Sequence, residues 1–385
     1  MDYRKSRRLL TVTIIFFWAS EYCHAPYFTP YLQTLGFAST AIGFMTGTYG
    51  FTQMLVRIPL GMATDATGSY RRTILMGTIL TTVSSFGLMF ATTMVPILIC
   101  RMLAGMAAST WLAFTILYNA YYKADESVQA MTNINAYNNT GKFIAFILGL
   151  ITASLWGYKI PLVCSFLTGV VAIVCASRLK PIALKHEPFS LQHAAKTVTN
   201  PAVLCAAAFA IVLQFFLQGT VFSFTSAVAQ NVGANAVEIG LATVLFTVVQ
   251  IVGARYLREP LSRMSAAKAV TIGCASLAVS GLFIGLAPSV WLIYPGQIAA
   301  GVGSMVLNSV LMSMVIRHTP QERQSTAMGM YQAVYGIGMA EGPVVVGALV
   351  SGYGYGNAYL TVAALMAMAT LAAPWAISKA DKTQR

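Results

Sequence analysis

Charged residues are scarce in this chain: only 9% of its 385 residues are Asp, Glu, Lys or Arg, whereas 57% are hydrophobic. Soluble proteins average about 25% charged residues, so the composition argues against an ordinary soluble domain. The six cysteines contain no C-x-x-C spacing, which argues against a metal cluster or disulfide framework and favours small buried side chains. No G-x-x-x-x-G-K-[ST] motif and no Ser/His/Asp nucleophile arrangement is present. We therefore expect no enzymatic step, no metal and no cofactor.

Long apolar runs dominate what is present. A run of about 20 apolar residues crosses a bilayer as a helix. Polar breaks divide the chain into twelve such runs, at 9–34, 38–61, 72–92, 95–121, 128–154, 159–178, 201–229, 236–256, 266–286, 289–316, 325–351 and 356–378. The sequence thus predicts an all-α integral membrane protein with twelve transmembrane helices.

The net charge of +13 indicates topology rather than nucleic-acid binding. Most of the 24 lysines and arginines lie before the first run, in the loops after the even-numbered runs, and after the last run. Lys159 stands alone on the opposite side, and positive residues concentrate on the cytoplasmic side of membranes. We expect a multi-pass protein of the plasma or inner membrane, with both termini in the cytoplasm. Its partners would be the bilayer, a small molecule and protons; we expect a monomer.

The chain is weakly self-similar at a shift of 197 residues. The matched positions, in nearly one register, are Ile42-Gly43 with Ile239-Gly240, Gln53 with Gln250, Ala130-Met131 with Ala327-Met328, Gly141 with Gly338, and Gly157 with Gly354. Such repetition predicts two similar halves. We expect two pseudo-symmetric six-helix bundles at 1–178 and 201–385, joined by a charged cytoplasmic linker at 179–200.

The segment 61–72, GMATDATGSYRR, follows the second apolar run. It resembles the signature Gly-x-x-x-Asp-x-x-Gly-x-x-basic-basic between helices 2 and 3 of the major facilitator superfamily (MFS). One position departs, since Ala66 stands where the family usually has a basic residue. The resemblance implies the MFS fold, with a substrate site at mid-membrane between the halves. It also implies a conformational gate that stabilises one closed state, formed by Gly61, Asp65, Gly68, Arg71 and Arg72.

Four ionisable residues lie deep inside apolar runs, where a charge at the bilayer centre costs about 2.5–3.5 kcal/mol on insertion scales. They are Glu21, Arg101, Lys142 and Glu341, with His24 one turn beyond Glu21. Arg101 opens Arg-x-x-x-Gly105-x-x-Ala108, which resembles the helix 4 motif of the family, where the arginine is associated with proton coupling. We interpret Glu21 as the proton carrier, with Arg101, His24 and Glu341 as further proton-coupling residues.

Polar residues complete the candidate substrate site. In the family that the chain resembles, helices 1, 4, 7 and 10 line the central cavity. Glu21 corresponds to Gln218 at the shift of 197 residues, and Arg101 to Gln297 at a shift of 196, so the first half carries charge where the second is neutral. The full set of predicted substrate contacts is Glu21, Arg101, Lys142, Asn139, Gln214, Gln218, Gln297 and Tyr335.

Structural explanations stay open beside these. Glu21 could form a static ion pair with Arg101 or Lys142 that holds helices together, and Glu341 could form polar contacts that hold neighbouring helices together. Glu21 and His24 share a helix face, but two ligands do not make a transition-metal site.

The best-supported hypothesis is a secondary transporter that moves a small organic anion or zwitterion with protons, by symport and alternating access. A second hypothesis is a proton-coupled exporter of amphiphilic or cationic compounds such as drugs. The segment Gly141-Lys142-Phe143 in helix 5 leans against this hypothesis, because drug exporters of the family carry a Gly-Pro pattern there. A third hypothesis is a non-transporting membrane sensor on the same scaffold.

Overall fold

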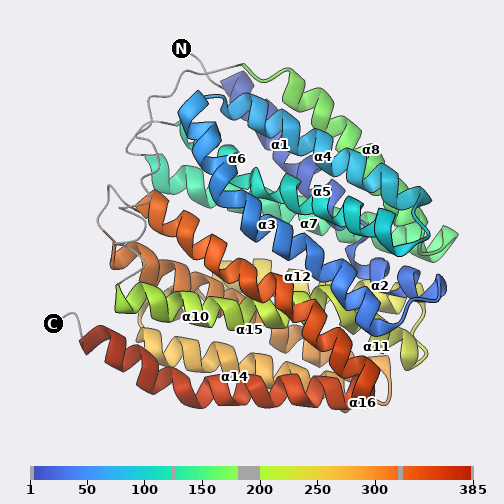
Figure 1. The fold of residues 1–385 in the computed structure, drawn as a ribbon. Coiled ribbons are helices and arrows are strands. Elements are labelled where there is room, and N and C mark those ends of the chain that lie inside the picture. The colour runs from blue at the N-terminus through green and yellow to red at the C-terminus, as the bar shows by residue number, and fades with distance from the viewer. Residues whose placement is uncertain (1–3, 123–125, 181–199, 320–323, 383–385) are drawn as a thin grey trace. The chain divides into compact units, whose positions relative to one another are not determined.

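The computed structural model describes residues 4–122, 126–180, 200–319 and 324–382 (Figure 1). Within these ranges nearly every residue is helical, as the apolar runs predict. Two compact units emerge, one made of Met1–Tyr31 with Phe51–Phe189 and the other of Leu32–Gly50 with Ser190–Arg385. The predicted linker lies mostly outside the described residues, so the domain boundaries at 178 and 201 stay a prediction.

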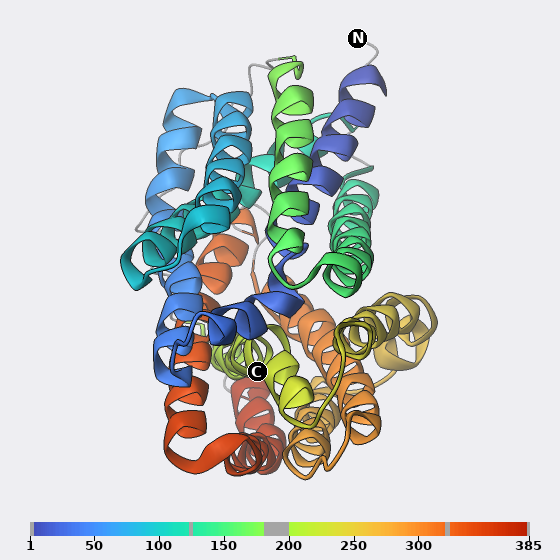
Figure 2. The same cartoon turned by 90° about the vertical axis from the view of Figure 1, so that its right-hand side faces the viewer.

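The first half of the chain folds into eight helical segments. They are α1 (Arg4–Tyr22), α2 (Ala25–Thr34), α3 (Ser39–Thr67), α4 (Tyr70–Phe90), α5 (Met94–Ser109), α6 (Trp111–Asn119), α7 (Ser127–Trp156) and α8 (Ile160–Ser177). α1 packs against α7 and α8, α8 against α4, and α4 against α5. In Figure 2, green α8 accordingly stands between light-blue α4 and dark-blue α1.

The break between α1 and α2 falls at Cys23 and His24, inside one predicted span. Pro26 has no amide hydrogen and suits the first turn of a new helix. The chain therefore ends α1 and begins α2 within the membrane. This break places irregular backbone beside Glu21 and His24.

The second half begins with a helix that changes its winding. α10 (Pro201–Phe216) runs into the π-helix η2 (Leu217–Phe224) and then α11 (Thr225–Asn231). Five segments follow: α12 (Ala236–Tyr256), α13 (Arg258–Ser262), α14 (Ala266–Gly285), α15 (Val290–Arg317) and α16 (Gln324–Lys382). Asn200 and Asn235 cap α10 and α12 through their side chains. α14 packs against both α15 and α16, and α10 against α16 (Figure 1).

Nine segments in the described ranges are long and apolar enough to cross a membrane. The last of them, Ala327–Lys379, contains a break at Gly354 and so comprises two helices. The α1–α2 pair and α3 complete the set; they are more polar, because α1 starts in a basic cluster and α3 carries Arg57 and Asp65. The predicted fold of twelve transmembrane helices in two related bundles is confirmed.

The repeat predicted from the sequence is visible in the backbone. Gly157 ends α7 with φ 87° and ψ 172°, and its partner Gly354 breaks α16 with φ 79° and ψ 169°. A second pair at the same shift, Gly36 and Gly233, has φ values of 84° and 86°. Only glycine takes such angles readily. Each half therefore turns in the same way at corresponding points.

Gly141 shows how closely α7 approaches α1. A Cβ at this position would lie 2.6 Å from the backbone oxygen of Ile15 and 3.1 Å from the Cβ of Trp18. Small residues allow such close helix contacts in membranes. The contact aligns α7 so that the next residue, Lys142, meets α1.

We expect Gly141→Ala to lower the melting temperature of the purified protein, at a cost of about 1–3 kcal/mol, because two backbones must separate. Gly352 in α16 is the matched control, since nothing lies within 4 Å of a Cβ there. Gly352→Ala should leave the melting temperature unchanged or raise it. Equal melting temperatures for the two variants would contradict the close α1–α7 contact.

Candidate functional site

A buried network of hydroxyl groups surrounds the α1–α2 break. The hydroxyl of Ser20 donates to the backbone oxygen of Ser165 in α8 at 2.7 Å and lies 3.3 Å from the Thr81 hydroxyl in α4. Nδ1 of His24 lies 3.0 Å from the Ser165 hydroxyl. Ser20 and His24 are four residues apart and so face α8 together. This network joins α1, α4 and α8 inside the first unit.

Glu21 lies at the edge of this network and is 7% exposed. The Thr81 hydroxyl forms a side-chain hydrogen bond with its carboxyl group, and Arg101 lies close enough to interact electrostatically with both Glu21 and His24. Oε1 of Glu21 has no hydrogen-bond partner among the described residues. Glu21 therefore belongs to a polar cluster around the α1–α2 break, in which Ser20 bonds the backbone oxygen of Ser165 while His24 contacts the Ser165 hydroxyl.

Arg101 is placed by an aromatic side chain from α2. Its guanidinium carbon lies 5.3 Å from the centre of the Phe28 ring, and Phe28 meets His24 edge to face at 5.4 Å. Arg101 itself is half-buried in α5. The structure thus brings together Glu21, His24 and Arg101, the three first-half residues predicted for proton coupling.

Lys142, in α7, packs against a separate face of α1. Its Nζ atom lies 4.8 Å from the ring centre of Trp18 and 4.8 Å from that of Tyr22, two residues one helical turn apart. No carboxylate forms an ion pair with Lys142 within the described ranges. The proposed static pair of Lys142 with Glu21 is therefore not formed in this structure, and two aromatic faces stabilise the ammonium group.

Two buried polar atoms without partners flank this lysine. Nε1 of Trp18 and Oδ1 of Asn138 have no hydrogen-bond partner in the part of the chain that the structure describes. Asn138 precedes Lys142 by one turn of α7, and the predicted contact Asn139 is half-buried beside it. Buried polar groups normally find a partner, so these two atoms are available to a ligand.

The predicted residues of the second unit are placed by α10, η2, α15 and α16. Gln214 and Gln218 are half-buried, with Gln218 in the π-helix. Short π-helical segments often occur at functional sites. Tyr335 meets Tyr331 edge to face at 5.5 Å, whereas Glu341 is exposed. Sequence reasoning missed the π-helix, because an extra backbone residue per turn leaves no motif.

Gln297 lies buried in α15. It is 1% exposed, and neither its Nε2 nor its Oε1 has a hydrogen-bond partner among the described residues. A buried amide without partners costs free energy in a static fold. A ligand that supplies those hydrogen bonds would remove this cost.

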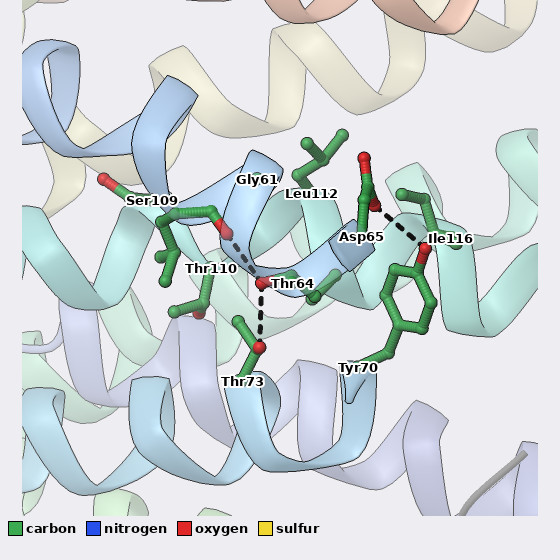
Figure 3. Close-up of a pocket in the computed structure, with 11 residues that line it drawn as sticks. Gly61, Thr64, Asp65, Tyr70, Thr73, Ser109, Thr110, Leu112 and Ile116 are labelled. Carbon is green, nitrogen blue, oxygen red and sulfur yellow. Dashed lines mark hydrogen bonds between the residues drawn. The ribbon is translucent and has the colours of Figure 1, made fainter. Parts of the chain in front are cut away.

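Part of the predicted gate borders a small recess lined mainly by residues of α3, α4 and α6 (Figure 3). Asp65 and Gly61 line the recess, and the Tyr70 hydroxyl donates to Oδ1 of Asp65 at 2.9 Å. Gly68, with φ 61°, makes the turn between α3 and α4. The recess is polar below Asp65, where the Thr64 and Thr73 hydroxyls lie 2.9 Å apart.

The two arginines of the predicted gate do not pair directly with Asp65 in the described structure. Nη2 of Arg71 donates to the backbone oxygen of Ser177 at 2.6 Å, at the end of α8, and Arg72 is exposed. A cation near the last carbonyls of a helix is favourable. Tyr70 therefore takes the place of a charged partner for Asp65, consistent with Ala66 at the position that is usually basic in the family.

The fold and these polar groups define a class: a multi-pass membrane protein that holds ionisable side chains inside a helical bundle, as secondary transporters do. The family model of the Major Facilitator Superfamily matches residues 10–224 and 204–385, so the chain belongs to that superfamily. It is a membrane transporter of a small molecule and not an enzyme.

Three similar proteins illustrate this membership. An uncharacterised MFS-type transporter of Methanocaldococcus jannaschii is 23% identical over 349 residues, covering 87% of this chain and 88% of the relative. The crystal structure of the nucleoside transporter NupG has 16% identity and a TM-score of 0.80, over 98% of this chain and 99% of that one. A POT family transporter in complex with 5-aminolevulinic acid has 13% identity and a TM-score of 0.78, over 97% and 96%. These structures share the fold.

We expect Tyr70→Phe to lower the melting temperature by removing the hydrogen bond to the half-buried Asp65 carboxylate, a loss of about 1 kcal/mol. Tyr353→Phe is the control, since that side chain is 69% exposed. Thermal unfolding in detergent measures both. A Tyr70→Phe variant as stable as Tyr353→Phe would show that the hydrogen bond adds nothing to the stability of the protein.

Gln297→Leu is expected to raise the melting temperature while weakening substrate binding, because leucine removes an amide that the described structure leaves unpaired. Gln250→Leu should have the opposite effect on stability, since Nε2 of Gln250 donates to the Ser304 hydroxyl at 2.7 Å. Melting temperature and uptake measured on both variants test this contrast. A fall in stability for Gln297→Leu would contradict it.

Proposed function

We propose that the protein is a proton-coupled symporter that carries a small organic anion or zwitterion by alternating access. The observation that supports this most strongly is Lys142, a cation within a membrane span that has no carboxylate partner in the described structure. A charge retained in hydrocarbon without an internal counter-ion is suited to an anionic ligand. Arg101 supplies a second positive group on α5.

Glu21 is the proposed proton carrier. A proton arriving from outside binds the Glu21 carboxylate and neutralises it, so that Arg101 loses an anionic neighbour and attracts the carboxylate of the substrate. When the substrate leaves on the inner side, Arg101 again stabilises ionised Glu21 and the proton departs. One proton and one substrate anion then cross together, with no net charge moved by the pair.

His24 and the hydroxyls of Ser20, Thr81 and Ser165 would hold and pass this proton. The Thr81 and Ser20 hydroxyls form one hydrogen-bonded pair, and His24 and the Ser165 hydroxyl form another. Each of these groups can both donate and accept a hydrogen bond, as a group that holds a proton in transit must. Glu341 is retained as a candidate proton site of the second unit.

The remaining predicted contacts would orient the substrate. These are Asn139, Gln214, Gln218, Gln297 and Tyr335, whose amide and hydroxyl groups can donate or accept hydrogen bonds. The gate formed by Gly61, Asp65, Gly68, Arg71 and Arg72 would make the contacts of one closed state, with Tyr70 on Asp65 and Ser177 on Arg71. Breaking them releases the other state.

The distribution of Lys and Arg supports a topology with both termini in the cytoplasm. The protein would act as a monomer in the plasma or inner membrane. A symporter in that membrane can use the inward proton gradient to accumulate substrate.

We expect Glu21→Gln to abolish anion accumulation driven by an imposed inward proton gradient in proteoliposomes but to preserve counterflow exchange, because the neutral amide mimics a permanently protonated carboxyl group. Glu259→Gln is the control, as Glu259 is 76% exposed and pairs with Arg263 at the surface. Intact pH-driven accumulation in Glu21→Gln would remove Glu21 from the carrier role. Efflux of cations from the wild type would favour an exporter, and ligand binding without flux would favour a sensor.

A further inference from the structure

The chemical groups around Lys142 indicate a narrower class of substrate. We propose that this site, the Lys142 pocket formed by Trp18, Tyr22, Asn138 and Lys142, binds an aromatic carboxylate with an amino or hydroxyl donor beside the carboxylate. Aromatic α-amino acids and α-hydroxy acids have this chemistry. The inference rests on the proposed function and adds that the substrate carries an aromatic ring and a hydrogen-bond donor.

The positive charge selects the carboxylate. Nζ of Lys142 lies above two ring faces, and a cation–π contact is weaker than a charge-assisted hydrogen bond to a carboxylate in a medium of low dielectric. A carboxylate that enters therefore draws the ammonium group from the rings. The unpartnered Nε1 of Trp18 offers a second hydrogen-bond donor on the same side of α1.

The vacated ring faces select an aromatic group. Trp18 and Tyr22 have ring centres 5.8 Å apart at an interplanar angle of 49°. The rings of Trp18 and Trp111 meet edge to face with their centres 5.2 Å apart, and those of Tyr22 and Phe146 do so with their centres 6.0 Å apart. Aromatic groups pair favourably with such faces in offset or edge-to-face geometry. When Lys142 leaves the faces, a ligand ring can replace its contact.

Asn138 favours a ligand with a hydrogen-bond donor. Its Oδ1 atom is buried and lacks a partner in the described structure, and Asn138 lies one helical turn from Lys142 on the same face of α7. An amide oxygen accepts hydrogen bonds, so it complements an ammonium or hydroxyl group on the ligand. A ligand whose carboxylate meets Lys142 while its α-substituent meets Asn138 satisfies both residues.

A matched ligand series tests the three ligand features, the carboxylate, the ring and the hydrogen-bond donor, separately. The probes are phenyllactate and phenylalanine (complete), phenylacetate (no donor), lactate (no ring) and phenethylamine (no carboxylate). Binding to the purified full-length protein is measured by thermal shift and by tryptophan fluorescence excited at 295 nm, where phenyl rings do not absorb. We expect phenyllactate or phenylalanine to bind at least tenfold more tightly than each incomplete probe.

Matched variants locate the binding. Lys142→Met keeps the length of the side chain and removes its charge, and it should weaken binding of the complete probes at least tenfold. Trp18→Phe keeps a ring but removes Nε1, and it should weaken binding several-fold. Lys159→Met, at an exposed lysine of the same unit, should bind as the wild type does. The wild-type probe series and Trp18→Phe test the site independently if Lys142→Met does not fold.

Each contrary outcome has a defined meaning. Lactate that binds as tightly as phenyllactate, with the same dependence on Lys142, would overturn the aromatic assignment and leave the proposed anion symport intact. Complete probes that bind equally well to Lys142→Met, or fail to bind the wild type, would overturn the Lys142 pocket itself. Phenethylamine binding more tightly than phenyllactate would overturn both the pocket and the proposed anion symport.

Discussion

The absence of water from the hydrocarbon core is the constraint on which this structure depends. Backbone groups there must pair within their own helix, and ionisable side chains must find partners inside the bundle. Glu21, His24 and Arg101 meet this constraint with a hydroxyl network and an aromatic ring, and Lys142 meets it with two ring faces. In the first unit, polar chemistry is thus concentrated around α1, where the helix itself breaks.

The break in α1 connects the fold to the site. Pro26 ends the regular helix within the membrane, and Ser20, Glu21 and His24 lie on the turns beside the break. The close contact of Gly141 with the backbone of Ile15 brings α7 against the same helix and aligns Lys142 with Trp18 and Tyr22. One short segment therefore places an acid, an imidazole and a lysine-bearing aromatic surface on neighbouring faces of α1. In the proposed mechanism, such an arrangement would let proton binding and anion binding influence each other through Arg101.

Several features of the fold and site follow from local sequence rules. Apolar length predicts the helices, and the shift of 197 residues predicts the turns at Gly157 and Gly354, whose φ and ψ values agree within about ten degrees. The grouping of Glu21 with Arg101 and His24 was also expected. Thr81 and Ser165 were not, because a hydroxyl on a distant helix carries no signal in the sequence that it will meet α1. The pairing of Asp65 with Tyr70 was not expected for a different reason: the motif that this segment resembles specifies basic residues at positions 71 and 72 but no residue type at position 70.

The sequence by itself determined the membrane setting, the helix number, the repeat and the identity of the buried charges, since these depend on composition and on spacing along one chain. The tertiary structure alone decided which groups those charges face: rings for Lys142, a hydroxyl network for Glu21, and a backbone carbonyl for Arg71. The physical reason is that helix rotation and tilt are set by the packing of small residues such as Gly141 against neighbouring backbones. A rotation of one residue, about 100°, would turn Lys142 away from α1.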